Sequence, residues 1–185
     1  MSIHLILGGA RSGKSAYAEK LAIESGLPVT YIATAQVYDD EFKARVQHHK
    51  DRRPSDWQLI EVPHLLGAAL QANIHADSGA PKISPNKHCV IVDCLTLWLA
   101  QCICPECVPP EGVDWQLERE KFLQRLPTLN ADIILVSNEV GMGIVPLGEI
   151  NRQFQDAQGR LNQAVAAIAD KVTFVAAGLP LTLKG

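Results

Sequence analysis

Short runs of apolar residues along this chain alternate with longer segments in which apolar residues recur every three or four positions. The short runs predict β-strands at residues 3–7, 29–33, 57–62, 89–93, 132–137 and 172–177. The intervening segments predict helices at residues 16–24, 39–50, 65–74, 95–103 and 115–126, and a long helix whose apolar stripe runs from Ile150 to Ile168. Strands that alternate with helices in this way are typical of an α/β fold, a mostly parallel sheet with helices on both faces.

A glycine-rich loop joins the first predicted strand to the first predicted helix, at residues 8–15. Its sequence, GGARSGKS, fits the P-loop pattern G-x-x-x-x-G-K-[ST]. Such a loop directs several backbone N–H groups into one concavity at the positive end of a helix, where phosphates bind. Lys14 would reach the outer phosphates of a nucleoside triphosphate, and the Ser15 hydroxyl would bind Mg²⁺. A chance glycine turn is the alternative, and the flanking strand and helix argue against it.

Several polar residues follow predicted strands directly: Thr34, Glu61, Asp93 and residues 138–139. The carboxyl ends of parallel strands share one edge of a sheet, so these side chains are expected to line the same crevice as the P-loop. Asp93 has the position of a Walker B carboxylate, which holds Mg²⁺, although it could instead cap the following helix. Glu61 is equally compatible with a solvated surface acid. The glycine-rich loop at residues 141–146 indicates either a substrate contact or a tight turn.

The sequence HHKDRR at residues 48–53 gathers two histidines and three cations at the end of a predicted helix. Lysine and arginine stabilise charge on a transferred phosphoryl or nucleotidyl group, and a neutral imidazole is a competent nucleophile toward phosphorus. His49 shares a helical stripe with Phe42 and Val46 and so faces the protein, whereas His48 is turned about 100° away. A solvated helix end is the alternative.

Composition and charge favour a single nucleotide-binding domain and argue against a nucleic-acid-binding or membrane-spanning protein. The 185 residues are 47% apolar and 20% charged, which fits one nucleotide-binding α/β domain spanning residues 1–185. The formal net charge of -3 gives no reason to expect nucleic acid as a partner, and no apolar run is long enough for a membrane span. The five cysteines, without a signal peptide, favour a cytoplasmic protein with free thiols. A zinc site is the alternative for the cluster Cys102, Cys104 and Cys107.

Taken together, these segments resemble one family, the bifunctional adenosylcobinamide kinase/adenosylcobinamide-phosphate guanylyltransferases of cobalamin biosynthesis. The matching stretches, in the family's order, are GGARSGKS (8–15), YIATAQ (31–36), DDEFKARVQHHKDRRP (39–54), VDCLTLW (92–98), SNEVGMGIVP (137–146) and the helix around Phe154, Asp156, Gly159, Arg160 and Asn162. The resemblance implies a RecA-like P-loop NTPase fold, ATP or GTP and Mg²⁺ as reactants, adenosylcobinamide and its phosphate as substrates, and a homotrimer.

The resemblance also implies how the two reactions divide among the residues. An NTP phosphorylates the aminopropanol hydroxyl of adenosylcobinamide, and GTP then guanylylates a histidine, His49 here, which passes GMP to the cobinamide phosphate. Lys14 and His49 would be the catalytic residues, and Ser15 and Asp93 the metal ligands. The implied nucleotide contacts are Gly8, Gly9, Ala10, Arg11, Ser12, Gly13, Lys14, Ser15, Ala33, Thr34, Ala35, Lys50, Asp51, Arg52, Arg53, Glu61 and Asp93.

Two other functions remain compatible with a P-loop protein. A monofunctional small-molecule kinase would transfer only the γ-phosphate, and its two histidines would be structural. A nucleotide-dependent switch would usually carry an N-K-x-D base-recognition motif, which this sequence lacks. Turnover of cobinamide distinguishes an enzyme from a switch, and a covalent GMP adduct distinguishes the bifunctional enzyme from the kinase.

Overall fold

Strands and helices alternate along the chain as the apolar pattern predicts. The computed structural model describes residues 1–36, 53–75, 88–104 and 114–185; the predicted helix at 39–50 lies outside them. The strands are β1 (Ser2–Gly8), β2 (Val29–Ala33), β3 (Gln58–Glu61), β4 (Cys89–Asp93), β5 (Asp132–Asn138), β6 (Lys171–Ala176) and β7 (Leu179–Lys184). The helices are α1 (Lys14–Ser25), α3 (Leu66–His75), α4 (Leu95–Ile103), α5 (Trp115–Arg125) and α6 (Glu149–Ile168), with a 3₁₀ turn at Leu126–Thr128.

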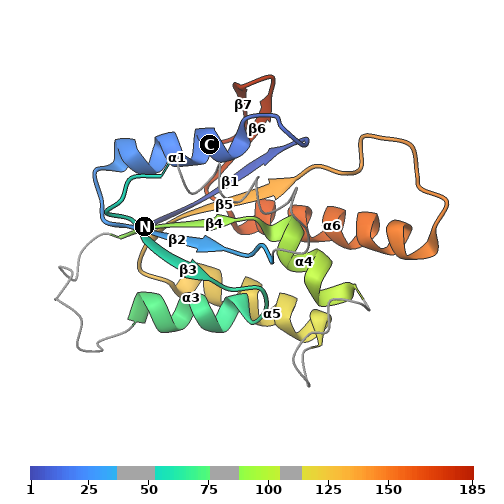
Figure 1. Cartoon of the computed structure of the whole chain (residues 1–185), viewed down its shortest axis with the longest axis horizontal. Helices are drawn as coiled ribbons and strands as arrows, with labels where there is room; N and C mark the ends of the chain where they lie inside the picture. Colours follow the sequence, from blue (N-terminus) through green and yellow to red (C-terminus); the bar gives the residue numbers. More distant parts are fainter. Residues whose placement is uncertain (37–52, 76–87, 105–113) are drawn as a thin grey trace.

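The strands form one seven-stranded sheet in the order β3-β2-β4-β5-β1-β6-β7, parallel except for β7. Helix α1 covers one face, whereas α3, α4, α5 and α6 cover the other, as Figure 1 shows. Alternate residues of the central strands supply the two cores: Leu5 and Leu7 face the four-helix side, and Ile6 faces α1. Because both faces are covered, these strands are apolar almost throughout. The predicted arrangement of helices on both faces is confirmed.

Strand register brings the predicted site residues to one edge of the sheet. Ala33 at the end of β2 pairs with Glu61 on β3 and with Asp93 on β4. Gly8, at the start of the P-loop, pairs with Asn138 at the end of β5. Strand β5 lies between the P-loop strand and the Asp93 strand, so this edge is a row of strand ends that meet the first turn of α1.

Strand β7 was not predicted; the expectation that β6 closes the sheet and runs to residue 177 is wrong. Ala177 (φ 51°) and Gly178 (φ 79°) form a tight turn after β6, and the chain returns antiparallel. The sequence does carry a strand signal there, since Leu179, Leu181 and Leu183 alternate with Pro180, Thr182 and Lys184, although every residue of β7 is exposed. Lys184 anchors the strand by donating to the carbonyl oxygens of Ala166, Ala167 and Ala169 near the end of α6.

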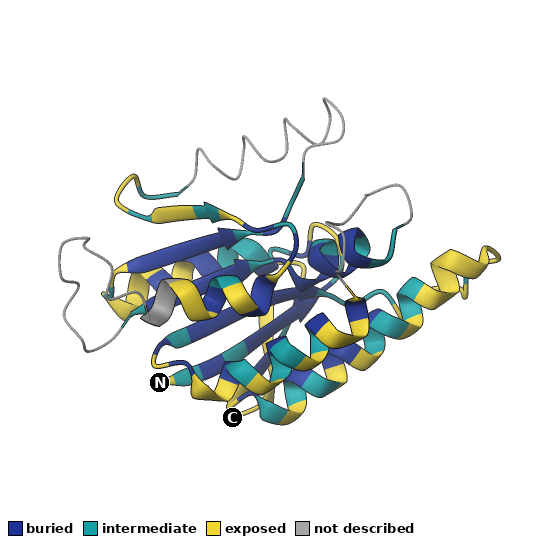
Figure 2. Ribbon diagram, turned by 90° about the horizontal axis from the view of Figure 1, so that it is seen from below, coloured by how far each residue is buried: buried dark blue, intermediate teal, exposed yellow. Residues whose placement is uncertain are grey.

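The first half of α6 and the loop before it extend beyond the sheet. In Figure 2 the middle of α6 is buried against the strands, whereas its first turns and the preceding loop are exposed. This extension carries large apolar side chains, with Ile144 and Leu147 each 97% exposed. None of the helices in the described ranges is long and apolar enough to cross a membrane.

Candidate nucleotide site

The P-loop has the backbone geometry of an anion site. Gly13 adopts φ 94°, a left-handed conformation that favours glycine, and α1 begins directly after it. No side chain caps this helix N-terminus, and its first turn has no acidic residue, so its backbone N–H groups remain available to an anion. At Gly8 a Cβ atom would lie 2.5 Å from the Val175 carbonyl oxygen, so only glycine fits there. A phosphate group therefore fits the loop.

The Lys14 side chain is buried beneath the P-loop and forms no ion pair with a described acid. The residue is 9% exposed, and its ammonium group donates to the Gly9 carbonyl oxygen at 3.0 Å. Burial lowers the pKa of Lys14, while Cys94 and Asp93 act in the opposite direction. A buried ammonium group with only a carbonyl partner is well placed to turn toward a phosphate oxygen.

The turn between β6 and β7, which was not predicted, packs against the P-loop and hydrogen-bonds to it. The Gly178 amide donates to the Ser12 carbonyl oxygen at 2.8 Å. A Cβ atom at Gly13 would approach the Gly178 Cα to 3.1 Å, so loop and turn are packed closely. The loop conformation is thus fixed by a segment far away in the sequence.

Asp93 lies within a cluster of aromatic and basic side chains. The buried Tyr31 hydroxyl donates to Asp93 Oδ2 at 2.6 Å. The Arg53 guanidinium lies 3.5 Å from the centre of the Tyr31 ring, and Trp57 stacks on that ring at 6.3 Å. Burial raises the pKa of Tyr31 well above 10.0, with the Asp93 carboxylate adding to the rise and Arg53 opposing it. The phenol is therefore a hydrogen-bond donor at any working pH.

Arg53 belongs to the predicted nucleotide-binding segment, and the structure brings it to the Asp93 edge. Its Nε and Nη1 atoms are buried and have no hydrogen-bond partner among the described residues. A buried guanidinium normally carries charge-assisted hydrogen bonds to an anion, so this orphaned group fits a site that receives phosphate. His49, Lys50, Asp51 and Arg52 lie outside the described residues, and their roles stay predictions.

Thr34 joins the ends of β2 and β4. Its hydroxyl donates to the Cys94 carbonyl oxygen at 2.7 Å and accepts from the Cys94 amide at 2.9 Å. Gln101 of α4 donates to the Thr34 carbonyl oxygen. The fully buried Thr34 side chain is therefore committed to holding Asp93 in place, and any nucleotide contact would come from the backbone of residues 33–35.

The remaining predicted positions lie along the same edge. Ser15 is half-buried in the first turn of α1, Asp93 is half-buried, and Glu61 is exposed at the end of β3. Asn138 is tied to α6, where Asn162 donates to its carbonyl oxygen at 3.0 Å. Glu139 accepts a hydrogen bond from the Gly141 amide at 2.7 Å, which makes the start of this loop a turn.

Tyr31 is the residue of this site to which sequence reasoning gave no role. It occurs in a quoted stretch, residues 31–36, but nothing in an apolar strand marks one aromatic residue as the partner of an acid 62 positions later. Their contact depends on β2 and β4 lying side by side in the sheet, which the sequence alone does not show.

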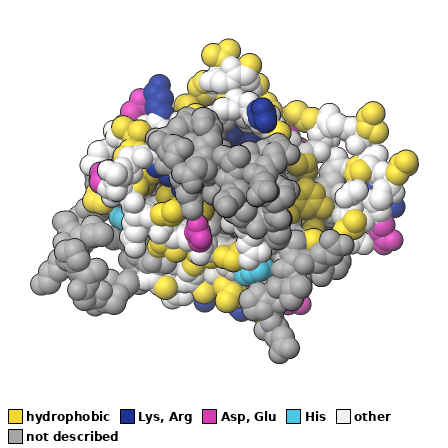
Figure 3. Space-filling view, viewed as in Figure 1, with side chains coloured by type: hydrophobic (Ala, Val, Ile, Leu, Met, Phe, Trp, Pro, Cys, Tyr) yellow, Lys and Arg dark blue, Asp and Glu magenta, His cyan; other side chains and the backbone are white. Residues whose placement is uncertain are grey.

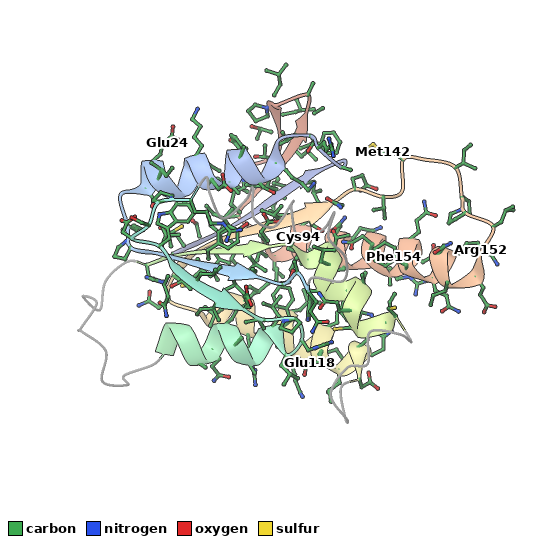
Figure 4. The ribbon with its side chains drawn as sticks, in the orientation of Figure 1. Glu24, Cys94, Glu118, Met142, Arg152 and Phe154 are labelled. Carbon is green, nitrogen blue, oxygen red and sulfur yellow. The ribbon has the colours of Figure 1, made fainter. Side chains whose placement is uncertain are left out.

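Three of the four described cysteines, Cys89, Cys94 and Cys102, are buried, whereas Cys104 is half-buried. Burial raises the pKa of Cys94 to about 12, that of Cys102 to about 12 and that of Cys89 to about 11. Figure 4 shows Cys94 deep in the molecule, in contrast to Met142 and Arg152 on the projecting loop and helix. In the described ranges no three His, Cys, Asp or Glu side chains group as metal ligands. Cys107, part of the alternative zinc site, lies outside them.

Comparison with known proteins identifies the family. The family described as "Cobinamide kinase / cobinamide phosphate guanyltransferase" matches residues 4–183, nearly the whole chain. The chain belongs to this family. The predicted family, and with it the prediction of an enzyme, is confirmed.

Two similar relatives within the cobinamide kinase / guanyltransferase family cover almost the full length. The "Bifunctional adenosylcobalamin biosynthesis protein CobP" of Pseudomonas aeruginosa is 50% identical over 181 residues, 98% of this chain and 96% of the relative. The corresponding protein named CobU from Salmonella typhimurium is 37% identical over 192 residues, covering 97% and 98% of the two chains.

A solved structure supports the fold. The chain resembles a solved "ATPase Domain" with a TM-score of 0.50 and 14% identity, over 94% of this chain and 68% of that one. At this identity the likeness concerns the fold alone. The predicted P-loop NTPase architecture of the RecA-like kind is confirmed.

Proposed function

We propose that this protein phosphorylates adenosylcobinamide with a nucleoside triphosphate and then transfers GMP from GTP to the product, giving adenosyl-GDP-cobinamide and pyrophosphate. The observation that supports this most strongly is the family match over residues 4–183, together with a P-loop whose geometry fits phosphate. Both reactions would use one nucleotide-binding domain over residues 1–185, in the cytoplasm.

In the kinase reaction the substrate hydroxyl oxygen attacks the γ-phosphorus, the bond to the β-phosphate oxygen breaks, and the nucleoside diphosphate leaves. The α1 N-terminus and Lys14 would bind the negative charge that develops on the transferred group. The hydroxyl proton would pass to a carboxylate at the strand edge, for which Asp93 and Glu139 are both candidates. Asp93 is held by Tyr31 at 2.6 Å, which leaves one of its oxygens free to accept a proton or bind a metal.

Mg²⁺ fits the donors at this edge, since hydroxyl and carboxylate oxygens are the ligands it prefers. Ser15 in the first turn of α1 and Asp93 at the end of β4 would hold it. Bound there, Mg²⁺ neutralises charge on the phosphates and aligns them. Tyr31 would orient the Asp93 carboxylate, and the Thr34 hydroxyl would fix the backbone of the adjoining Cys94.

In the guanylyl transfer a neutral His49 nitrogen attacks the α-phosphorus of GTP, and pyrophosphate leaves. A phosphate oxygen of adenosylcobinamide phosphate then attacks the same phosphorus and releases the histidine. Lys50, Asp51, Arg52 and Arg53 would surround the reacting group. The two buried Arg53 nitrogens without a hydrogen-bond partner among the described residues, next to the Tyr31 ring whose hydroxyl binds Asp93, support this placement for the end of the segment.

The test is incubation with GTP radiolabelled in the α-phosphate, with Mg²⁺, followed by denaturation. A covalent label that is acid-labile and alkali-stable is expected in wild-type protein and in His48→Ala, and none in His49→Ala. Absence of label in a wild-type protein that still phosphorylates adenosylcobinamide would leave a monofunctional kinase. Failure to turn over adenosylcobinamide at all would refute the proposed function.

We also propose a homotrimer, the assembly that the family resemblance implies, and the exposed apolar side chains of the extension before α6 support association between copies of this chain. Figure 3 shows hydrophobic side chains gathered over the β6–β7 hairpin and over this extension. Light scattering is expected to give about three times the protomer mass of 20.1 kDa. Ile144→Ser should dissociate the assembly, whereas Leu117→Ser, on exposed α5, should not. A monomeric wild-type protein would refute the proposal.

A further inference from the structure

A polar cavity lies away from the P-loop, on the four-helix face of the sheet. It has a volume of about 390 Å³, which is within the range of small-molecule sites. The end of α4 at Ile103, the first turns of α5 and the first half of α6 enclose it. The polar and aromatic side chains that line it are Trp115, Gln116, Arg119, Gln153, Asp156 and Arg160. We call it the α4–α6 cavity.

The α6 residues that line this cavity lie on a side of the helix that does not pack against the sheet. Gln158, Leu161, Asn162 and Val165 face the strands and are buried. Gln153, Asp156 and Arg160 lie on the neighbouring stripe, which faces α5 across the cavity. Their position is therefore not explained by packing against the sheet.

Within the described residues, the charged side chains of the cavity, Arg119, Asp156 and Arg160, form no ion pairs, and Asp156 and Arg160 are exposed. The Nε atom of Arg119 is buried without a hydrogen-bond partner. Buried polar atoms are normally satisfied, so an orphaned guanidinium nitrogen indicates a group that binds from outside.

The mixture of lining groups matches carboxamides. Two guanidinium groups offer donors, a carboxylate offers acceptors, and the Gln116 and Gln153 amides offer both. A carboxamide needs both kinds of partner. Arg119 and Arg160 alone would suit an anion, but Asp156 and the glutamine oxygens add acceptors that an anion would not use.

Helices α4 and α6 connect the cavity to the nucleotide site. Helix α4 starts two residues after Asp93 and ends at Ile103 on the cavity wall, and its nine residues span about 13 Å. Arg160 is only two residues from Asn162, which contacts the end of β5 beside the P-loop strand. A propionamide joined to aminopropanol is about 9 Å long when extended, from its bond lengths. This arm is shorter than the span of α4, so a corrin ring whose edge lies in the cavity must itself extend toward Asp93 to bring the terminal hydroxyl to the P-loop.

We infer that the α4–α6 cavity binds the carboxamide-bearing edge of the corrinoid substrate. The corrin ring is fringed with acetamide and propionamide groups, which this set of donors and acceptors suits, and the Trp115 indole offers an apolar surface beside them. The inference rests on the proposed function, because only a corrinoid-phosphorylating enzyme would need such a site.

The test is steady-state kinetics of the kinase reaction with Arg119→Ala, Arg160→Ala and a Gln116→Ala/Gln153→Ala double variant. The glutamine side chains are exposed, so the double variant should fold even if an arginine variant does not. KM for adenosylcobinamide should rise roughly tenfold per lost charge-assisted hydrogen bond, while kcat and KM for the nucleotide stay within about twofold. Arg125→Ala, on the same helix but outside the cavity, is the matched control and should behave as wild type.

The possible failures are distinguishable. If the wild-type enzyme turns over adenosylcobinamide and every folded cavity variant keeps its KM for it, the inference is overturned and the proposed function stands. A parallel rise in KM for the nucleotide would also overturn it, since that places these residues in the nucleotide site. If wild-type protein does not phosphorylate adenosylcobinamide, both are refuted.

Discussion

Replacing Tyr31 with phenylalanine removes one hydroxyl group from the centre of the candidate site and nothing else. The ring keeps its packing against Trp57 and its position under the Arg53 guanidinium. What is lost is the 2.6 Å hydrogen bond to Asp93 Oδ2. The variant therefore isolates the contribution of that bond to stability and to the behaviour of the carboxylate.

The magnitude follows from the burial and charge of the pair. Tyr31 is 2% exposed, so water cannot replace the lost donor freely. A hydrogen bond to a charged group contributes about 1.5–3 kcal/mol, so we expect the unfolding free energy to fall by about 2 kcal/mol. Because the same bond orients a proposed metal ligand, the Mg²⁺ concentration for half-maximal kinase activity should rise roughly tenfold.

Urea unfolding and Mg²⁺ titrations of the kinase reaction measure the two effects. Tyr17→Phe is the matched control, because Tyr17 is a half-buried tyrosine of α1, packed against the same core, whose hydroxyl has no hydrogen bond among the described residues. If Tyr31→Phe loses no more stability than Tyr17→Phe and has an unchanged Mg²⁺ requirement, the reasoning about the Tyr31–Asp93 pair is refuted. A loss of stability with an unchanged Mg²⁺ requirement would confine the pair to a structural role.

Three further outcomes are expected. Gly8→Ala should lose about 1–3 kcal/mol of stability together with nucleotide binding, because its Cβ would meet the Val175 carbonyl oxygen. Gly9→Ala, which has open space around a Cβ, should keep its stability and its nucleotide binding. Urea denaturation and nucleotide titrations measure the two properties. Burial lowers the pKa of His4 below its ordinary value of 6.5, so the neutral imidazole stabilises the fold above that pH, and this contribution is lost as the pH falls through the folded-state pKa. His4→Gln should therefore flatten that part of a plot of unfolding free energy, measured in urea, against pH. An unchanged slope in the variant would contradict this. In native protein at about pH 8, peptide mass spectrometry after iodoacetamide treatment should find no alkylation of the raised-pKa thiols Cys89, Cys94 and Cys102, and rapid alkylation there would show that they are not buried.

Features encoded in short stretches could be read from the sequence. Strands β2 and β4 were predicted at the bounds that the structure has, because each is a short apolar run bounded by polar or turn residues. The P-loop was found because its glycines and lysine occupy fixed spacings between a strand and a helix. The prediction that Asp93 and Glu61 reach the P-loop edge followed from one rule, that parallel strands end on the same side, and the register confirms it.

Features that depend on which segments become neighbours could not be read in this way. The support of Ser12 by Gly178, the bond from Tyr31 to Asp93 and the α4–α6 cavity each join residues far apart in the chain. Strand β7 has alternating leucines that could have been read as a strand, but its exposure on both faces and its antiparallel pairing with β6 appear only in the tertiary structure. The sequence by itself determined the local elements and the chemistry of the phosphate loop, because these depend on spacing within a few residues. Only the tertiary structure decided which polar groups are buried, paired or left unpartnered, because desolvation and hydrogen bonding depend on the neighbours that folding brings together.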